Sequence, residues 1–165
     1  MIPLSNLTIA LVLCAFSALA NAQPRIAVLD FELKDLTYIP GVPQEIERTA
    51  SVKPMLEAEL TKSGFGIISI PLTAQKEATA GAGYLFDHHD IAAQLAQKYD
   101  ADYVLVGRLH KPSYLFVYLM AHLVDVKQQR LIADYSSEVK GGEKKLTLKG
   151  VESLVVKLND TFKGL

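Results

Sequence analysis

DADYVLVGRLHKPSYLFVYLMAHLVD, residues 100–125, is the longest apolar run of the chain beyond its amino-terminal segment. The halves 103–109 and 115–126 each predict a β-strand, with a connection at residues 110–113. In the second half the side chains on both alternating faces are largely apolar, so we expect helices or a partner to cover both faces. A turn at residues 127–129 then leads into a strand at 131–139, which predicts an antiparallel hairpin.

The chain around this stretch alternates short apolar runs with amphipathic segments. Residues 25–32 (RIAVLDFE) and 65–70 predict two further strands. Apolar residues at spacings of three and four predict helices at 51–62, 87–99 and 146–162. Ser51 and Asp87 are the expected amino-terminal caps, and the Ala- and Gly-rich segment 71–84 is expected to be a mobile connection.

This order of elements defines the expected fold class. Strands that alternate with helices favour parallel pairing at the start of the chain, and the hairpin then adds antiparallel strands at one side. We therefore predict an α/β fold, mixed in the α+β sense, with a single five-stranded mixed sheet. Its expected strand order is 2-1-3-4-5, with helices on both faces.

The first 22 residues differ from the rest of the chain. They carry no charged side chain, are nearly all apolar from Leu7 to Ala20, and end in the small-x-small sequence Ala20-Asn21-Ala22. This pattern is typical of a secretory signal peptide cleaved after Ala22, and an uncleaved anchor is the alternative. We expect residues 23–165 to form one exported domain with no stable membrane span after cleavage.

Composition limits the functions that the exported part can have. The formal net charge is −1, so no electrostatic field favours binding to nucleic acid. The single cysteine, Cys14, lies in the signal segment, so residues 23–165 have no disulfide, thiolate metal site or cysteine nucleophile. Because segment 71–84 contains neither G-x-G-x-x-G nor Gly-Lys-Ser/Thr, no cofactor is predicted.

Three sequences together resemble a known kind of domain. RIAVLDFE, ADYVLVGRLHK and VDVKQQRLIA resemble the α/β domain of exported bacterial proteins such as the amino-terminal domain of TolB and the lipoprotein CsgG. A closer resemblance is to small exported bacterial proteins of unknown function that consist of little beyond this domain. At the hairpin turn Gln128-Gln129 replace the Thr-Gly that is common in such families. The resemblance implies a periplasmic domain that acts through protein contacts. Service to an oxidation or secretion system is a narrower expectation that rests on the compartment alone.

Charged side chains at strand ends form the first candidate site. Asp30 and Glu32 end the first strand, and Arg108 and His110 end the third, beside the position where the predicted strand order switches. An acid and an imidazole facing each other there could bind a polar ligand or carry out acid–base hydrolysis. The structural alternative is ion pairing at strand ends. No residue is assigned as catalytic.

The remaining candidates concern metals and partners. His88 and His89 lie next to each other and point about 100° apart on a helix, so no metal site is predicted there, and we expect both to be solvated. His122 is expected to be hydrogen-bonded and half-buried. Exposed Phe116 and Tyr118 are the expected surface for a periplasmic protein partner, and the strand at 131–139 offers an edge for a homo-oligomer. An interaction module without catalysis is the main hypothesis, and a small-molecule binder or hydrolase is the alternative.

Overall fold

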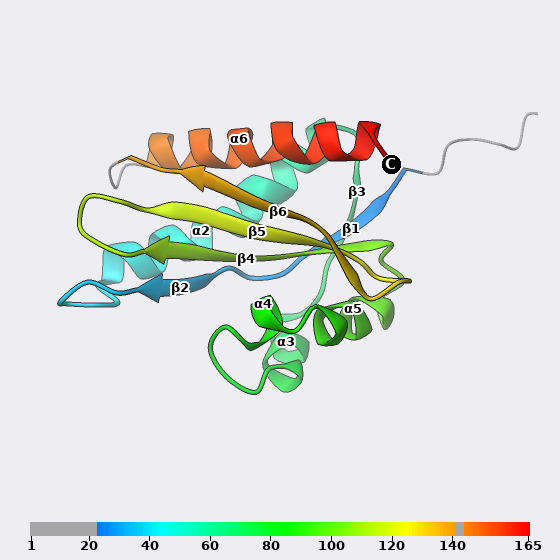
Figure 1. Cartoon of the computed structure of the whole chain (residues 1–165), viewed down its shortest axis with the longest axis horizontal. Helices are drawn as coiled ribbons and strands as arrows, with labels where there is room; N and C mark the ends of the chain where they lie inside the picture. The colour runs from blue at the N-terminus through cyan, green and yellow to red at the C-terminus, as the bar shows by residue number, and fades with distance from the viewer. Residues whose placement is uncertain (1–22, 141–143) are drawn as a thin grey trace, which may run out of the picture.

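The computed structural model describes residues 23–140 and 144–165, so the expected signal peptide lies outside the described residues. Within these ranges, six strands form one mixed sheet and five helices cover its two faces (Figure 1). The strands are β1 (Arg25–Val28), β2 (Glu32–Asp35), β3 (Gly66–Ile68), β4 (Tyr103–Lys111), β5 (Tyr118–Asp125) and β6 (Arg130–Glu138). The helices are α2 (Pro43–Lys62), α3 (Leu72–Ala78), α4 (Tyr84–Asp87), α5 (His89–Gln97) and α6 (Lys144–Lys163).

The sheet has the order β3-β1-β4-β5-β6, and β2 pairs with β4 beyond the end of β1. β1 is parallel to both β3 and β4, whereas β4, β5 and β6 are successively antiparallel. The predicted order and the mixed α/β class are therefore confirmed. The sheet has six strands rather than five because the first strand, predicted at 25–32, is interrupted after Val28 and β2 continues beyond its predicted end to Asp35.

The division of that first strand is a β-bulge. Val28 is the partner of Leu105, and Glu32 is the partner of Arg108, so four steps along one strand match three along the other. Asp30 lies in this interval. The extra residue shifts the alternation of side chains, so that both Val28 and Phe31 pack in the core under α2 and α6.

Helices cover each face of the sheet with a separate apolar core. α2 and α6 lie on one face, and α3, α4 and α5 lie on the other (Figure 1). Val52, Leu56 and Leu60 of α2 are fully buried at intervals of four residues, as their amphipathic pattern predicts. Both faces of β4 are buried, which explains why residues 103–109 are almost continuously apolar.

Three helical predictions need correction. α2 begins at Pro43 and not at Ser51, whose hydroxyl donates a hydrogen bond to the carbonyl oxygen of Arg48 instead of capping the helix. Proline suits the first turn of a helix, where Pro43 lies, whereas Pro54 lies inside α2. The segment 71–84, expected to be a mobile connection, contains α3. Asp87 ends α4 instead of capping the next helix, because its carboxylate bonds to Arg108.

Candidate functional site

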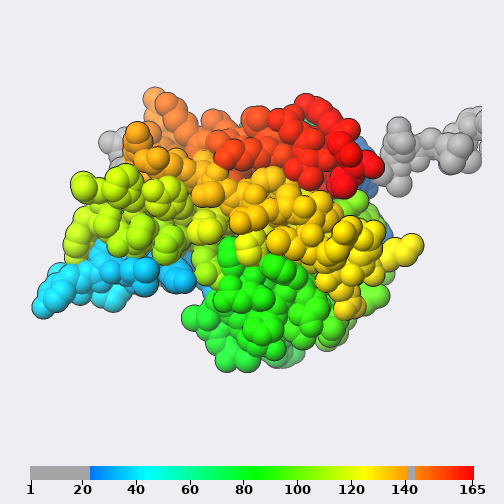
Figure 2. All heavy atoms as spheres, viewed as in Figure 1, coloured from blue at the N-terminus to red at the C-terminus, as the bar shows by residue number. Residues whose placement is uncertain are grey.

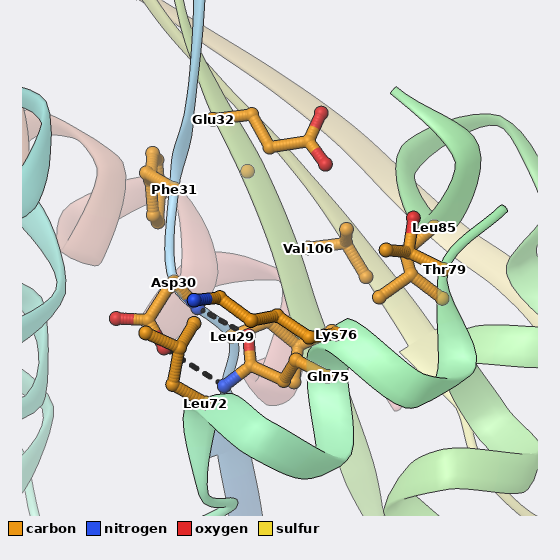
Figure 3. Close-up of a pocket in the computed structure, with 11 residues that line it drawn as sticks. Leu29, Asp30, Phe31, Glu32, Leu72, Gln75, Lys76, Thr79, Leu85 and Val106 are labelled. Atoms are coloured by element: carbon orange, nitrogen blue, oxygen red, sulfur yellow. Dashed lines mark hydrogen bonds between the residues drawn. The ribbon is translucent and has the colours of Figure 1, made fainter. Parts of the chain in front are cut away.

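The carboxylates of Asp30 and Glu32 lie on opposite sides of their strand (Figure 3). In an unbroken strand these two residues would point the same way, but the bulge separates them. Asp30 accepts hydrogen bonds from Lys53 Nζ at 3.0 Å and from Gln75 Nε2 at 2.8 Å. Gln75 also accepts a hydrogen bond from the backbone N–H of Asp30 through its Oε1, at 2.9 Å. Asp30 therefore connects the bulge to α2 and α3.

Glu32 faces a hollow of about 190 Å³ on the α4 side of the sheet. Arg108, its register partner, lines the same hollow together with Lys34, Asp87 and the loop that precedes α4. The carboxylate of Glu32 accepts a hydrogen bond from the backbone N–H of Gly83. Gly83 has a φ of +80°, a left-handed conformation that favours glycine. The structure thus brings Glu32 and Arg108 to one site and leaves Asp30 outside it.

The guanidinium group of Arg108 is held between an aromatic ring and a carboxylate. Its Cζ lies 3.5 Å from the centroid of the Phe86 ring, and its Nη2 donates to Asp87 Oδ1 at 3.2 Å. The side chain of Arg108 is 9% exposed, whereas that of Asp87 is 65% exposed. Arg108 Nε is buried and has no hydrogen-bond partner. A buried cationic N–H without an acceptor is rare, which makes this atom a candidate position for a bound acceptor.

His110 lies one step further along the same face of β4 and pairs in register with Lys34 and Tyr118. Burial, together with the charges of Lys34 and Arg108, lowers the pKa of its imidazole. Its Nδ1 is buried without a partner. His110 lines neither the hollow beside Asp30 nor the hollow of Glu32 and Arg108.

A second hollow, of about 170 Å³, lies beside the bulge and is shown in Figure 3. Most of its lining is apolar and comes from Leu29, Leu72, Leu85 and Val106. Glu32 borders both hollows, and Lys76 crosses over this one from α3 (Figure 3). The carboxyl end of β1 is therefore open on the α3 side as well as on the α4 side.

A separate apolar surface, which we call the apolar tip, lies at one end of the molecule. It is made by the loop between β2 and α2, the start of α2, and the loop between β4 and β5. In Figures 1 and 2 the two loops are the blue and yellow-green segments at the left. Its large apolar side chains are Leu36, Tyr38, Ile39, Ile46, Tyr114, Leu115 and Phe116, which are between 46% and 93% exposed. Residues 36–44 and 112–119 contain no charged side chain.

Hydrogen bonds at its base hold the apolar tip in shape. Asp35 accepts from the backbone N–H of Thr37 at 3.0 Å and from that of Gly41 at 3.1 Å. Burial would raise the pKa of the Asp35 carboxyl, but these bonds, the Thr37 hydroxyl and the charge of Lys111 together lower it. The two loops also meet directly, because the backbone N–H of Ile39 donates to the Tyr114 hydroxyl at 3.3 Å.

The two residues predicted as a partner surface differ in exposure. Phe116 is 46% exposed and belongs to the apolar tip, whereas Tyr118 is half-buried in β5. Their rings lie nearly parallel, with centroids 6.4 Å apart. Tyr118 is also the register partner of His110, so the face that carries the strand-end residues continues toward the apolar tip.

The histidines point to different partners. His88 stacks on Tyr84, and its Nδ1 lies 3.0 Å from the carbonyl oxygen of Tyr84. His89 is not solvated as expected, because its Nε2 lies 2.9 Å from Nδ1 of His122. The predicted half-buried, hydrogen-bonded state of His122 is confirmed. Within residues 23–140 and 144–165, no group of three or more His, Cys, Asp or Glu side chains is placed to hold a metal ion.

Sequence reasoning missed several residues that shape these sites. Gln75 and Gly83 belong to the segment expected to be a mobile connection, and Asp87 was assigned to a cap. The apolar tip has a signal that could have found it. Each loop contains turn-forming residues such as proline, glycine or serine, which indicate exposure to water. Each also contains Tyr, Leu, Ile or Phe and no charged residue, and this composition is unusual for loops that face water.

The architecture defines the class of protein: a mixed α/β domain with a parallel start, an antiparallel hairpin and helices on both faces of the sheet. The chain belongs to the family DUF3280, described as "Protein of unknown function (DUF2380)", which matches residues 24–158. A comparison with curated proteins gives no match. In the part of the chain that the structure describes, no helix has the length and apolar character needed to cross a membrane.

Solved structures share this fold at low sequence identity. Lipoprotein GNA1162 from Neisseria meningitidis is 19% identical, with 82% of this chain and 96% of that chain covered and a TM-score of 0.51. The LpoB C-terminal domain from Salmonella enterica is 16% identical, with 73% and 84% covered and a TM-score of 0.50. TolB from Acinetobacter baumannii is 18% identical, with 87% and 29% covered and a TM-score of 0.55. These matches confirm the resemblance to TolB at the level of fold, and the resemblance to CsgG stays a prediction.

Proposed function

We propose that this protein is an exported accessory module without catalytic activity, which binds a protein partner through the apolar tip. The observation that carries the proposal is the gathering of large exposed apolar side chains on two uncharged loops at one end of the molecule. Apolar patches that stay exposed on a soluble fold commonly mark interaction sites. The periplasmic location rests on the apolar segment 1–22. Service to an oxidation or secretion system is a narrower proposal that rests on compartment alone.

The composition of the apolar tip fits a protein interface. Tyr38 and Tyr114 present large rings with few rotatable bonds, and tyrosine is enriched among the residues that dominate binding energies. Their loops are already held by Asp35 and by the bond between Ile39 and Tyr114, so docking would order little additional chain. Preorganised loops with apolar anchors are typical of protein-binding surfaces.

The experiment is capture of partners by residues 23–165 from a native periplasmic extract, with three forms of the protein in parallel. The test variant replaces Tyr38 and Leu115 by serine, since these side chains are 93% and 80% exposed and contribute little to the core. The control is Val156→Ser on α6, which removes an apolar side chain that is 60% exposed and lies far along the chain from the tip. We expect a stoichiometric protein that the wild type and Val156→Ser capture and that the double variant loses.

The affinity of the captured protein is then measured with the purified pair. Loss of one aromatic anchor typically weakens binding by about tenfold or more. Equal capture by the double variant would contradict the proposal. So would binding of the apolar tip to lipid vesicles with no protein partner, since that result would assign the surface to a membrane.

A further inference from the structure

The hollow between β2, β4 and α4 contains two ionic groups that the protein does not pair with each other. Arg108 is buried and its Nε has no acceptor. Glu32 accepts a hydrogen bond from Gly83 but, within the described part of the chain, makes no ion pair with any cation. Charged groups removed from water normally find a partner of opposite sign. Arg108 Nε therefore has no acceptor beside the Asp87 pair, and among the residues that the structure describes the half-buried Glu32 has no cationic partner.

The free edge of Arg108 defines the negative group. Nε–H and Nη2–H lie on the same edge of a guanidinium and form a planar fork that matches the two oxygens of a carboxylate. Asp87 now occupies only half of this fork, through one oxygen at 3.2 Å from Nη2. The Asp87 side chain is 65% exposed, so it can return to water at small cost. Phe86 covers the flat face of the guanidinium and restricts its orientation, so a ligand reaches the buried Nε only when Asp87 moves away.

The balance of charge defines the rest of the ligand. Lys34 and Arg108 supply two positive charges to the hollow, and Glu32 and Asp87 supply two negative charges. A simple carboxylate would add a third negative charge beside Glu32, whereas a ligand that carries both charges would leave the balance unchanged. An ammonium group next to the carboxylate of Glu32 would also give that residue the cation it lacks.

We propose that this hollow binds a small zwitterion, a free α-amino acid or the equivalent group of a larger molecule. Its carboxylate takes the Nε and Nη2 edge of Arg108 in place of Asp87, and its ammonium group lies against Glu32. Lys34 stands at the rim, and the glycine-containing loop around Gly83 closes the other side. This site is independent of the apolar tip and does not rest on the function proposed above.

The test compares two probes, L-alanine and propionate, by NMR titration of the protein comprising residues 23–165. Propionate keeps the carboxylate and lacks the ammonium group. We expect saturable binding of L-alanine with a shift of the Arg108 Nε–H resonance, and binding of propionate that is roughly tenfold weaker. No saturable binding of L-alanine, or saturation without any shift of Arg108 Nε–H, would overturn the proposal. Equal affinity for the two probes would overturn the zwitterion assignment.

Three variants of this site are expected to change the binding of the two probes in different ways. Asp87→Ala removes the competing carboxylate and should tighten L-alanine binding. Glu32→Gln keeps an acceptor for the Gly83 N–H but loses the negative charge. It should therefore weaken the binding of L-alanine and strengthen the binding of propionate. Arg108→Lys keeps the positive charge without the planar fork and should weaken both probes by about tenfold or more. Asp90→Ala, an exposed acid on α5, is the matched control and should change neither affinity.

Folding of each variant is checked by its thermal unfolding curve. Asp87→Ala removes a mostly exposed side chain, so its effect on affinity is interpretable even if Arg108→Lys fails to fold. Weaker binding of L-alanine to Asp87→Ala would contradict displacement of that residue. The Tyr38 and Leu115 double variant should bind L-alanine normally, which separates a failure of this site from a failure of the apolar tip.

Discussion

His122 is the residue whose protonation should couple the fold to pH. Its Nδ1 lies 3.1 Å from the carbonyl oxygen of Phe86, which can only accept, so we assign the proton of the neutral ring to Nδ1. The same atom faces His89, and Nε2 lies 3.7 Å from Asp134. Burial lowers the pKa of His122, and the charges of His89 and Arg108 lower it further, whereas the Phe86 carbonyl and Asp134 raise it.

The free energy of unfolding should therefore decrease as the pH falls below about 6.5, the ordinary pKa of histidine. In that range the unfolded chain takes up a proton at His122 that the folded protein resists, so acid favours unfolding. His110 has a lowered pKa for similar reasons and adds in the same direction. Urea unfolding at pH 7.5, 6.5 and 5.5 measures the effect.

Two variants separate the contribution of His122 from that of other groups. His122→Gln should flatten the pH dependence, because no titrating ring remains at this position. Asp134→Asn should steepen it, since Asp134 is the one carboxylate that favours the charged imidazole. An unchanged slope in His122→Gln would show that the acid sensitivity arises elsewhere.

At the scale of elements, the β-bulge depends on one glycine. A Cβ atom at position 107 would lie 2.2 Å from Cζ of Phe31. The Phe31 ring therefore occupies the space that the side chain of any residue other than glycine would need at this position. Phe31 is only 7% exposed and packs in the core under α2 and α6. Gly107→Ala should therefore destabilise the protein by about 1–3 kcal/mol through overpacking.

A double-mutant cycle identifies the contact that is responsible. Phe31→Leu alone should also destabilise, because it removes buried ring atoms. The double variant should be less destabilised than the sum of the two single changes by roughly 0.5 kcal/mol or more, since the smaller side chain leaves room for the alanine methyl. Strict additivity, measured by urea unfolding, would show that Gly107 acts through the backbone and not through Phe31.

The same bulge shows why elements were predictable and the candidate site only partly so. β4, β5, β6 and α6 follow from apolar periodicity, which is a local signal, and their order follows from general rules of connection. One extra residue between Val28 and Glu32 leaves no local signal, yet it separates Asp30 from Glu32. Glu32 and Arg108 do meet, because partners in parallel register reach the same edge of the sheet. The roles of Gln75 and Asp87 depend on contacts between distant segments.

At the scale of the whole molecule, the two proposed surfaces consist of different residues. The apolar tip is at the opposite end from the C-terminus and from the start of β1 (Figure 1). The hollow that contains Glu32 and Arg108 is lined by β2, β4, the loop before α4 and the end of α4. A partner on the tip and a small ligand in the hollow therefore contact different residues, which makes their separate tests meaningful.

The outer edge of β6 decides whether the domain associates with itself. The sequence predicted a free edge for a homo-oligomer, and β6 is indeed the last strand of the sheet. However, Nζ of Lys157, on α6, donates a hydrogen bond to the carbonyl oxygen of Ser136 in β6. A lysine over an edge is a common means of preventing strand-to-strand association.

We therefore expect the domain to be monomeric at low concentration and Lys157→Ala to self-associate more strongly. Sedimentation velocity over a concentration series measures this, with Lys163→Ala at the exposed end of α6 as the control. A stable wild-type dimer that Lys157→Ala does not strengthen would show that association uses another surface.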